Sequence, residues 1–255
     1  MDDDTWRKAR MCLTDYASLI QEFRSREYQA VDFTAAEPDR RHLVLRHDVD
    51  MCLERAAAMA TTEAELGVSA SYFLLVNTEM YNVGSRHARN LVREILRHGH
   101  KVGLHFDGSG IPEGDVDALH KEVRLEAEIL EQHTGCAVTV ITFHRPQKWL
   151  IGFPQLVAGR LHGYLPRFFH DIGYCADSGG EFRFHHPLEH PAVLAGRALQ
   201  LVTHPIWWCA SRDEDPLRKL ERFFDDRARL LAVELAANCK PYRKSPRLRA
   251  LTESP

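Results

Sequence analysis

The sequence predicts a wound α/β domain, built on either an open parallel sheet or a (β/α) barrel. Short apolar runs alternate along the chain with longer amphipathic stretches, which is the order of strands and helices in such folds. The apolar runs are rich in β-branched and aromatic residues, as expected for strands that are buried on both faces. Most of these runs also end in ionisable side chains, which predicts a functional site at one end of the sheet.

Six apolar runs are predicted to be strands, and four amphipathic stretches are predicted to be helices. The strands cover residues 42–48, 70–76, 101–107, 138–144, 173–177 and 198–204. The helices cover residues 6–29, 88–96, 116–134 and 217–235, where apolar residues recur at helical spacing. The intervening segment 148–191 is rich in Gly, Pro, His and aromatic residues, and we expect it to form loops over a site.

Length and composition fit one globular domain. With 255 residues, of which 44% are hydrophobic and 27% charged, the chain can bury a sizeable core. We expect a single domain over 1–240, with helix 6–29 packed on it, and a polar tail over 241–255. The net charge of −3 argues against a nucleic-acid binder that uses a broad basic face, and no apolar run is long enough to span a membrane. Six scattered cysteines and an acidic, polar start of the chain predict a cytoplasmic protein with free thiols.

Ionisable side chains gather at the carboxyl ends of the predicted strands. Five strands end in His47-Asp48-Val49-Asp50, His105-Phe106-Asp107, His144-Arg145-Pro146, Asp177-Ser178 and His204-Pro205. In parallel sheets and barrels these ends share one rim, so residues far apart in sequence converge there. Imidazole and carboxylate groups together suit Zn²⁺ or another first-row divalent ion, and the remaining Asp and His can act as general base and general acid.

These strand-end motifs, in this order, resemble the polysaccharide deacetylase superfamily (carbohydrate esterase family 4) over roughly residues 43–208. The resemblance implies a distorted (β/α) barrel that holds one divalent metal ion. We expect Zn²⁺, with Co²⁺, Ni²⁺, Fe²⁺ and Mn²⁺ as alternatives. The chain would belong to a divergent subgroup marked by H-D-V-D, because one residue separates two carboxylates that are adjacent in the family.

The resemblance implies metal ligands at the ends of three strands. Asp50 of HDVD matches the family's metal-binding aspartate, and His105 of GHKVGLHFDGS matches its first metal-binding histidine. The family's second histidine would fall at Ser109, which is a poor ligand. We therefore take His144, which precedes the arginine of FHRP, as the third ligand, and keep Asp107 as the alternative.

The resemblance also implies catalytic roles for four residues. Asp48 of HDVD would be the general base, and Arg145 of FHRP would orient it. Asp177 of ADSGG would in turn orient that arginine. His204 of LVTHPIWW would be the general acid that protonates the leaving amine.

The implied reaction is hydrolysis of an N-acetyl or other N-acyl amide on a small amino sugar or its precursor, which releases the amine and acetate. A cytoplasmic enzyme would meet a precursor and not a finished polymer. Asp107, Trp207 and Trp208 are candidate substrate-binding residues, although the tryptophans could equally be core aromatics. Two alternatives stay open: a metal amidohydrolase acting on a ureide or formamide, and a catalytically inactive carbohydrate-binding relative. An aromatic pocket would favour a sugar, and a pocket lined by Arg or Lys an anionic substrate that is not a sugar.

Overall fold

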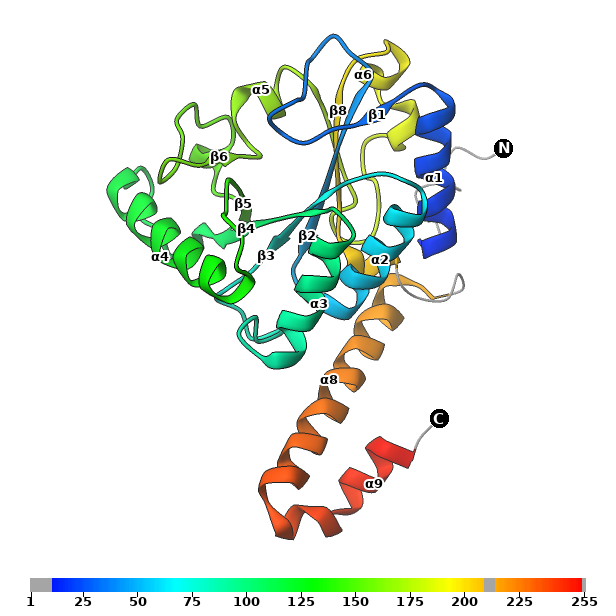
Figure 1. Cartoon of the computed structure of the whole chain (residues 1–255), viewed down its shortest axis with the longest axis vertical. Coiled ribbons are helices and arrows are strands. Elements are labelled where there is room, and N and C mark those ends of the chain that lie inside the picture. The colour runs from blue at the N-terminus through cyan, green and yellow to red at the C-terminus, as the bar shows by residue number, and fades with distance from the viewer. Residues whose placement is uncertain (1–10, 209–213, 254–255) are drawn as a thin grey trace. The chain divides into compact units, whose positions relative to one another are not determined.

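The computed structural model describes residues 11–208 and 214–253, and the chain divides into two compact units, Met1–Arg212 and Asp213–Pro255. The first unit is built on one parallel sheet, so the α/β prediction is confirmed (Figure 1). Its strands are β1 Gln29–Ala30, β2 His42–Val49, β3 Ser71–Leu74, β4 Lys101–Asp107, β5 Val140–His144, β6 Leu161–His162, β7 Gly173–Ala176 and β8 Leu199–Thr203. Its helices are α1 Leu13–Ser25, α2 Leu53–Glu65, α3 Arg86–Arg97, α4 Val116–Thr134, α5 Pro166–Phe169, α6 Pro191–Leu194 and α7 Pro205–Trp208, with 3₁₀ turns η1 Gly108–Gly110, η2 Lys148–Leu150 and η3 Pro187–Glu189.

All six predicted strands are present, and several further elements were not predicted, among them β1, β6 and α2. Strands β1 and β6 contain only two residues each, too few to show as an apolar run. Helix α2 buries Arg55 and Glu63 along with its alanines, so its sequence shows no clean apolar stripe. The part of the predicted helix 6–29 that falls within the described residues is α1, Leu13–Ser25.

The sheet is curled into an open barrel. Its hydrogen-bonded order is β6-β5-β4-β3-β2-β8-β7, with β1 paired to β2 off this path. Although four strands separate β6 from β8, the Nε2 amide of Gln200 on β8 donates to the backbone oxygen of Gly163, directly after β6, over 3.0 Å. Such a contact requires the sheet to bend round on itself. Helices α1, α2, α3 and α4 form a continuous row on the outside, each packed on the next (Figure 1).

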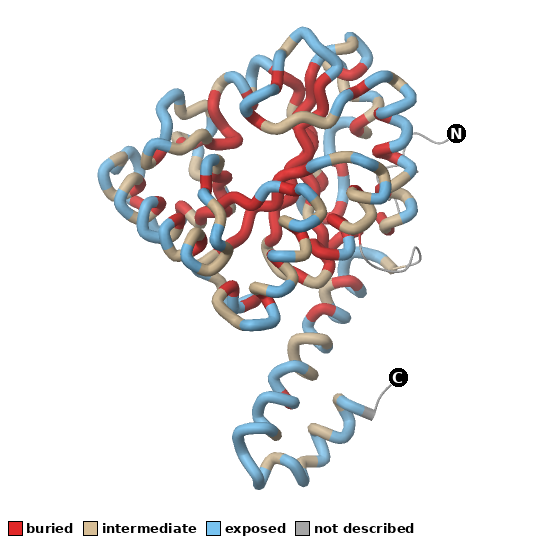
Figure 2. The backbone as a smooth tube through the Cα atoms, viewed as in Figure 1, coloured by how far each residue is buried: buried red, intermediate tan, exposed pale blue. Residues whose placement is uncertain are grey.

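Strand β2 runs through the middle of the buried sheet, which Figure 2 shows in red, and its alternate residues build the barrel interior in layers. Val44 joins an apolar plug with Phe33, Phe73 and Phe168. Arg46 comes next, and Asp48 lies above it at the carboxyl end of the strand. Apolar packing at one end of the barrel therefore supports a polar layer at the other.

The opposite face of β2 is fixed by a buried carboxylate. Glu63 of α2 accepts hydrogen bonds from the hydroxyls of Tyr16 at 2.5 Å and Tyr72 at 2.6 Å, and lies 2.7 Å from Nε2 of His47. His47 in turn contacts the hydroxyl of Thr203 at 2.6 Å. These contacts tie α1, α2, β2, β3 and β8 together, which holds the carboxyl end of β2 in place.

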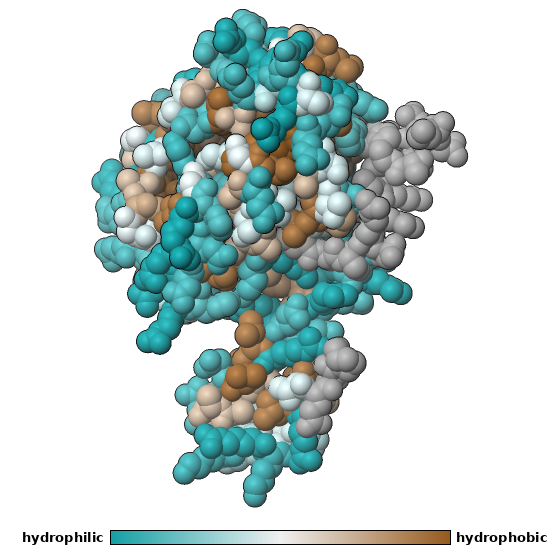
Figure 3. All heavy atoms as spheres, turned by 45° about the vertical axis from the view of Figure 1, so that its right-hand side comes forward, coloured by the Kyte–Doolittle hydropathy of each residue, from teal (hydrophilic) through white to brown (hydrophobic). Residues whose placement is uncertain are grey.

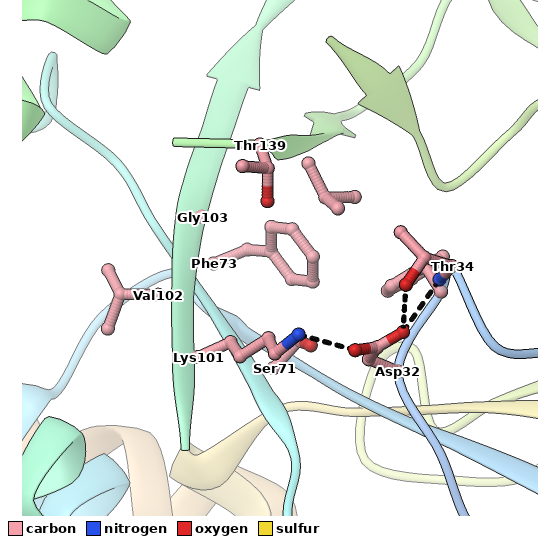
Figure 4. A pocket seen from close by; sticks show the side chains of 10 residues that line it. Asp32, Thr34, Ser71, Phe73, Lys101, Val102, Gly103 and Thr139 are labelled. Atoms are coloured by element: carbon pink, nitrogen blue, oxygen red, sulfur yellow. Dashed lines mark hydrogen bonds and ion pairs between the residues drawn. The ribbon is translucent and has the colours of Figure 1, made fainter. Parts of the chain in front are cut away.

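A different arrangement is found where the amino-terminal ends of β3 and β4 face Asp32. A small cavity of ≈ 20 Å³ lies there, which is room for about one water molecule. Lys101 forms an ion pair with Asp32 beside it, and Asp32 also accepts from the backbone and hydroxyl of Thr34 (Figure 4). A Cβ on Gly103 would lie 2.5 Å from the Phe73 ring, so glycine is what lets that ring enter the core plug. We assign this end of the barrel to stability.

The second unit contains α8 Pro216–Asn238, the 3₁₀ turn η4 Lys240–Lys244 and α9 Pro246–Glu253. The predicted helix 217–235 is α8, and the segment 241–255, expected to be a polar tail, carries η4 and α9 within its described part. Arg229 of α8 donates to the backbone oxygen of Leu251 of α9 over 2.9 Å. The boundary between the two compact units lies at 212/213, and the single domain expected over 1–240 stays a prediction.

Apolar side chains are exposed along α8, and Figure 3 shows apolar surface on this unit in brown. The exposed residues are Leu217, Phe224, Leu230, Leu231, Val233 and Leu235. Within the described parts of both units, no helix has the length and apolar character needed to cross a bilayer.

Candidate active site

A pocket of ≈ 380 Å³ opens at the carboxyl ends of the strands. Side chains at or after the ends of β2, β4, β5, β7 and β8 line it, so the predicted convergence on one rim is what the structure shows. Its size is within the range of small-molecule sites. The predicted loop segment 148–191 contributes Tyr164, Tyr174, Ser178 and Gly179 to its wall.

Three of the lining residues form a group that could hold a metal ion. Possible ligand atoms of Asp50, His105 and His144 all lie within 4.8 Å of one another. Oδ1 of Asp50 is 3.1 Å from Nε2 of His105 and 3.4 Å from Nδ1 of His144. Asp107, the alternative third ligand, is not part of this group and pairs with Arg145.

Two features of this group fit a divalent cation. Oδ1 of Asp50 is buried and has no hydrogen-bond partner within the described residues, which is costly unless a cation binds there. Nδ1 of His105 lies 2.7 Å from the hydroxyl of Thr142, and this contact turns its Nε2 toward Asp50, as outer contacts do for metal-binding histidines. Burial opposes the charged form of Asp50, but the nearby imidazoles of His105 and His144 outweigh this effect and lower the pKa of the carboxyl. Two nitrogens and a carboxylate are a donor set that Zn²⁺ accepts.

Asp48 lies beside this group and is held by a buried arginine. Both of its oxygens accept from Arg46, over 2.8 Å from Nε and 2.7 Å from Nη2. Oδ2 of Asp48 is also 3.8 Å from Nε2 of His105. Burial would raise the pKa of Asp48, but the charge of Arg46, followed by that of His105, lowers it. The carboxylate is therefore ionised and fixed in orientation.

Arg46 was not among the residues predicted for the site. It is fully buried, its Nη1 donates to Gln200 over 3.2 Å, and its guanidinium lies 4.8 Å from the centre of the Tyr164 ring. Gly163 leaves room for it, because a Cβ there would lie 3.0 Å from Nη1 of Arg46. The sequence does contain a signal for Arg46. It lies two residues before Asp48 on the same strand, and alternate residues of a strand point to the same face.

The structure does not bring Arg145 to Asp48. The guanidinium of Arg145 forms an ion pair with Asp107 and is largely exposed. The backbone of Arg145 has a φ of 48°, so the chain turns sharply after β5 and directs this side chain toward the rim. The contact that the resemblance implied for Arg145 is therefore made by Arg46.

Asp177 binds the imidazole of His204, and not Arg145. Nδ1 of His204 lies 2.6 Å from Oδ1 of Asp177, which also accepts from the backbone N–H of His204 at 3.1 Å. The indole of Trp208 donates to Oδ2 of Asp177 over 2.7 Å. Nε2 of His204 is left facing the pocket, 3.8 Å from Oδ2 of Asp50. Burial lowers the pKa of His204, but Asp177, and after it Asp50 and Asp48, raise it to about 9.

The two candidate tryptophans lie in different places. Trp207 lines the pocket, whereas Trp208 is buried and packs edge-on against Tyr16. Tyr164 and Tyr174 also line the pocket and were not predicted. Tyr164 lies in the irregular part of segment 148–191, and Tyr174 lies on β7. Aromatic rings therefore form part of the pocket wall.

No family model and no curated protein matches the chain. Among solved structures, a family 4 acetyl xylan esterase from Clostridium thermocellum is 13% identical with a TM-score of 0.41, covering 72% of this chain and 84% of its own. A peptidoglycan N-acetylglucosamine deacetylase is 14% identical with a TM-score of 0.46, and the match covers 79% of this chain and 87% of that protein. A family 4 pseudoenzyme from Bacillus anthracis is 12% identical with a TM-score of 0.41, and the match covers 74% of this chain and 63% of that protein. At identities and TM-scores this low, a function has to rest on the side chains of the site itself.

Proposed function

We propose that this protein is a metal-dependent hydrolase that removes an N-acetyl group from a small amino-sugar substrate. One observation carries the proposal. The possible metal ligands Asp50, His105 and His144 share a pocket with an ionised Asp48 and with His204, whose Nε2 faces the same space. Metal-assisted amide hydrolysis needs metal ligands, a general base and a general acid close together, and this cavity contains side chains suited to all three roles.

Asp50, His105 and His144 would hold the ion, which when bound acts as a Lewis acid on the acyl oxygen and makes water a better nucleophile. Asp48 accepts the proton of the attacking water. Arg46 donates to both oxygens of Asp48, and the hydroxyl of Thr142 donates to Oδ1 over 3.4 Å, which leaves a lone-pair site of Oδ2 for the water. Nε2–H of His204 donates a proton to the leaving amine nitrogen, while Asp177 keeps Nδ1 of the ring protonated.

The pocket wall supports a sugar as the substrate. Tyr164, Tyr174 and Trp207 are among the residues that line the cavity, and aromatic side chains pack well on the apolar faces of sugars. The volume of ≈ 380 Å³ suits a ligand of about one or two rings, as a small precursor would be. A comparison of N-acetylated monosaccharides with chitin oligomers tests this part. Rates that rise steadily with chain length would contradict it.

Replacing Asp48 with Asn, or His204 with Ala, should leave the metal content unchanged and lower turnover by about 10²- to 10⁴-fold, the usual contribution of an acid–base group. In the His204 variant, Asp177 keeps two donors, the backbone N–H of residue 204 and the indole of Trp208. The Asn variant leaves Arg46 without a counter-ion, so its folded fraction must be measured alongside. Elemental analysis and an amine-release assay give both quantities.

Lys148→Gln is a suitable control for these variants, because Lys148 is exposed and is not among the residues that line the pocket. A loss of only a few-fold for Asp48→Asn or His204→Ala would remove that residue from its role. A wild-type protein that binds metal and releases no amine from any N-acetylated sugar would contradict the proposed function itself.

A further inference from the structure

Arg145 occupies a position that the proposed chemistry does not use. It directly follows the candidate ligand His144, and its backbone has a φ of 48°, a conformation that is uncommon for a residue with a side chain. Such backbone conformations persist where the surrounding structure enforces them, and they cluster at ligand sites. The side chain lines the pocket, yet it is 67% exposed, which places its guanidinium at the pocket mouth.

Asp107 holds this guanidinium from one side. It forms an ion pair with Arg145 and also accepts from the backbone N–H of Ser109 over 3.0 Å. One carboxylate uses only part of the five N–H donors of an arginine, and the rest are available to a ligand.

The other charged groups of the pocket are already engaged. Arg46 neutralises Asp48, and the two histidines near Asp50 face that carboxylate. Among the lining residues within 11–208 and 214–253, Arg145 is the one Arg or Lys side chain. A planar guanidinium with free N–H groups binds carboxylates and phosphates by two parallel hydrogen bonds.

We propose that Arg145 is a specificity-determining residue that binds an acidic group, a carboxylate or a phosphate, on the substrate. This inference rests on the proposed function and narrows its substrate class to an acidic N-acyl amino sugar. Because Arg145 directly follows His144 and lines the same pocket, the acidic group binds in the same pocket as the amide that is cleaved. The aromatic wall then contacts the ring, and Arg145 contacts its charge.

The test compares three substrates on the metal-loaded enzyme: N-acetylglucosamine, its 6-phosphate and N-acetylmuramic acid. The first is neutral, the second carries a phosphate and the third a carboxylate. We expect the wild type to favour at least one acidic sugar over the neutral one by about 10- to 100-fold in kcat/KM, since charge-assisted hydrogen bonds contribute on this scale. Arg145→Gln should remove most of that preference, mainly through KM. Lys148→Gln removes a nearby exposed charge and should keep the preference.

Arg145→Lys separates geometry from charge. It keeps the positive charge without the planar fork, so we expect it to recover only part of the preference. If the wild type prefers only the 6-phosphate or only N-acetylmuramic acid, the result shows whether Arg145 binds a phosphate or a carboxylate. A wild type that hydrolyses all three sugars equally, or an Arg145→Gln variant that slows all three by the same factor, would overturn the inference while leaving the proposed function intact.

A binding measurement keeps the inference testable if no sugar is hydrolysed. Titration calorimetry with glucosamine 6-phosphate, glucosamine and muramic acid should show that the wild type binds an acidic sugar more tightly than the neutral one. That difference should shrink about 10-fold or more in Arg145→Gln. Equal affinities in the two proteins would overturn the role of Arg145, whereas metal binding without turnover would count against the hydrolase proposal alone.

Discussion

Replacing His105 with Ala is expected to remove the bound divalent ion and with it the activity. His105 is 1% exposed, and its Nε2 lies 3.1 Å from the unpartnered Oδ1 of Asp50. Mutation of the outer partners of metal ligands typically costs about 10- to 100-fold in metal affinity, so loss of a direct ligand should cost at least the upper end of that range. Elemental analysis of the purified protein and competition with a chelator measure the loss.

Two further variants make this result specific. Thr142→Val keeps the shape of the side chain but removes the hydroxyl that contacts Nδ1 of His105, and we expect it to weaken metal binding by about 10-fold. His100→Ala is the matched control. His100 is also buried, but its ring contacts the backbone of Ala60 and Ala70, so the variant should lose stability and keep its metal. Unchanged metal content in His105→Ala would refute the site, as would a wild type with no affinity for divalent ions.

The metal group could be predicted from the sequence because it depends on strand ends alone. Once residues 42–48, 101–107 and 138–144 are assigned as parallel strands, their last residues must meet at one rim, whatever the exact register. The choice of His144 over Asp107 needed the structure. Both follow a strand end, and the two are paired in register across β4 and β5, but the side chain of Asp107 is engaged by Arg145.

The partners of the catalytic groups depend on information that the strand pattern does not contain. Asp177 and His204 meet because β7 pairs with β8, and the order β2-β8-β7 is a property of the whole sheet. Arg46 is buried beside Tyr164 because the sheet curls, which brings the segment after β6 over β2. Arg145 pairs with Asp107, and no residue pattern predicts the φ of 48° at this non-glycine residue.

Replacing Arg46 with Met is expected to lower both stability and turnover more than any change at Arg145. The substitution leaves Asp48, which is 4% exposed, as a buried charge without its counter-ion. Breaking a buried ion pair in this way typically costs about 3–5 kcal/mol of the free energy of unfolding. Turnover should fall by about 10²-fold or more, because the base loses both its orientation and its charge state. By contrast, Arg145→Gln breaks an exposed pair and should cost less than about 1 kcal/mol. Chemical denaturation and the amine-release assay measure the two effects.

The double variant Arg46→Met/Asp48→Asn distinguishes lost catalysis from lost folding. Removing both charges takes away the unpaired carboxylate, so we expect much of the lost stability to return while turnover stays low. Gly163→Ala is a milder change, since its Cβ would lie 3.0 Å from Nη1 of Arg46 and 3.2 Å from Oε1 of Gln200. It should shift the guanidinium slightly and reduce turnover with little effect on metal content. If Arg46→Met kept full activity while Arg145→Gln lost it with a neutral sugar, the base would be oriented by Arg145 in solution, and the role assigned to Arg46 would be wrong.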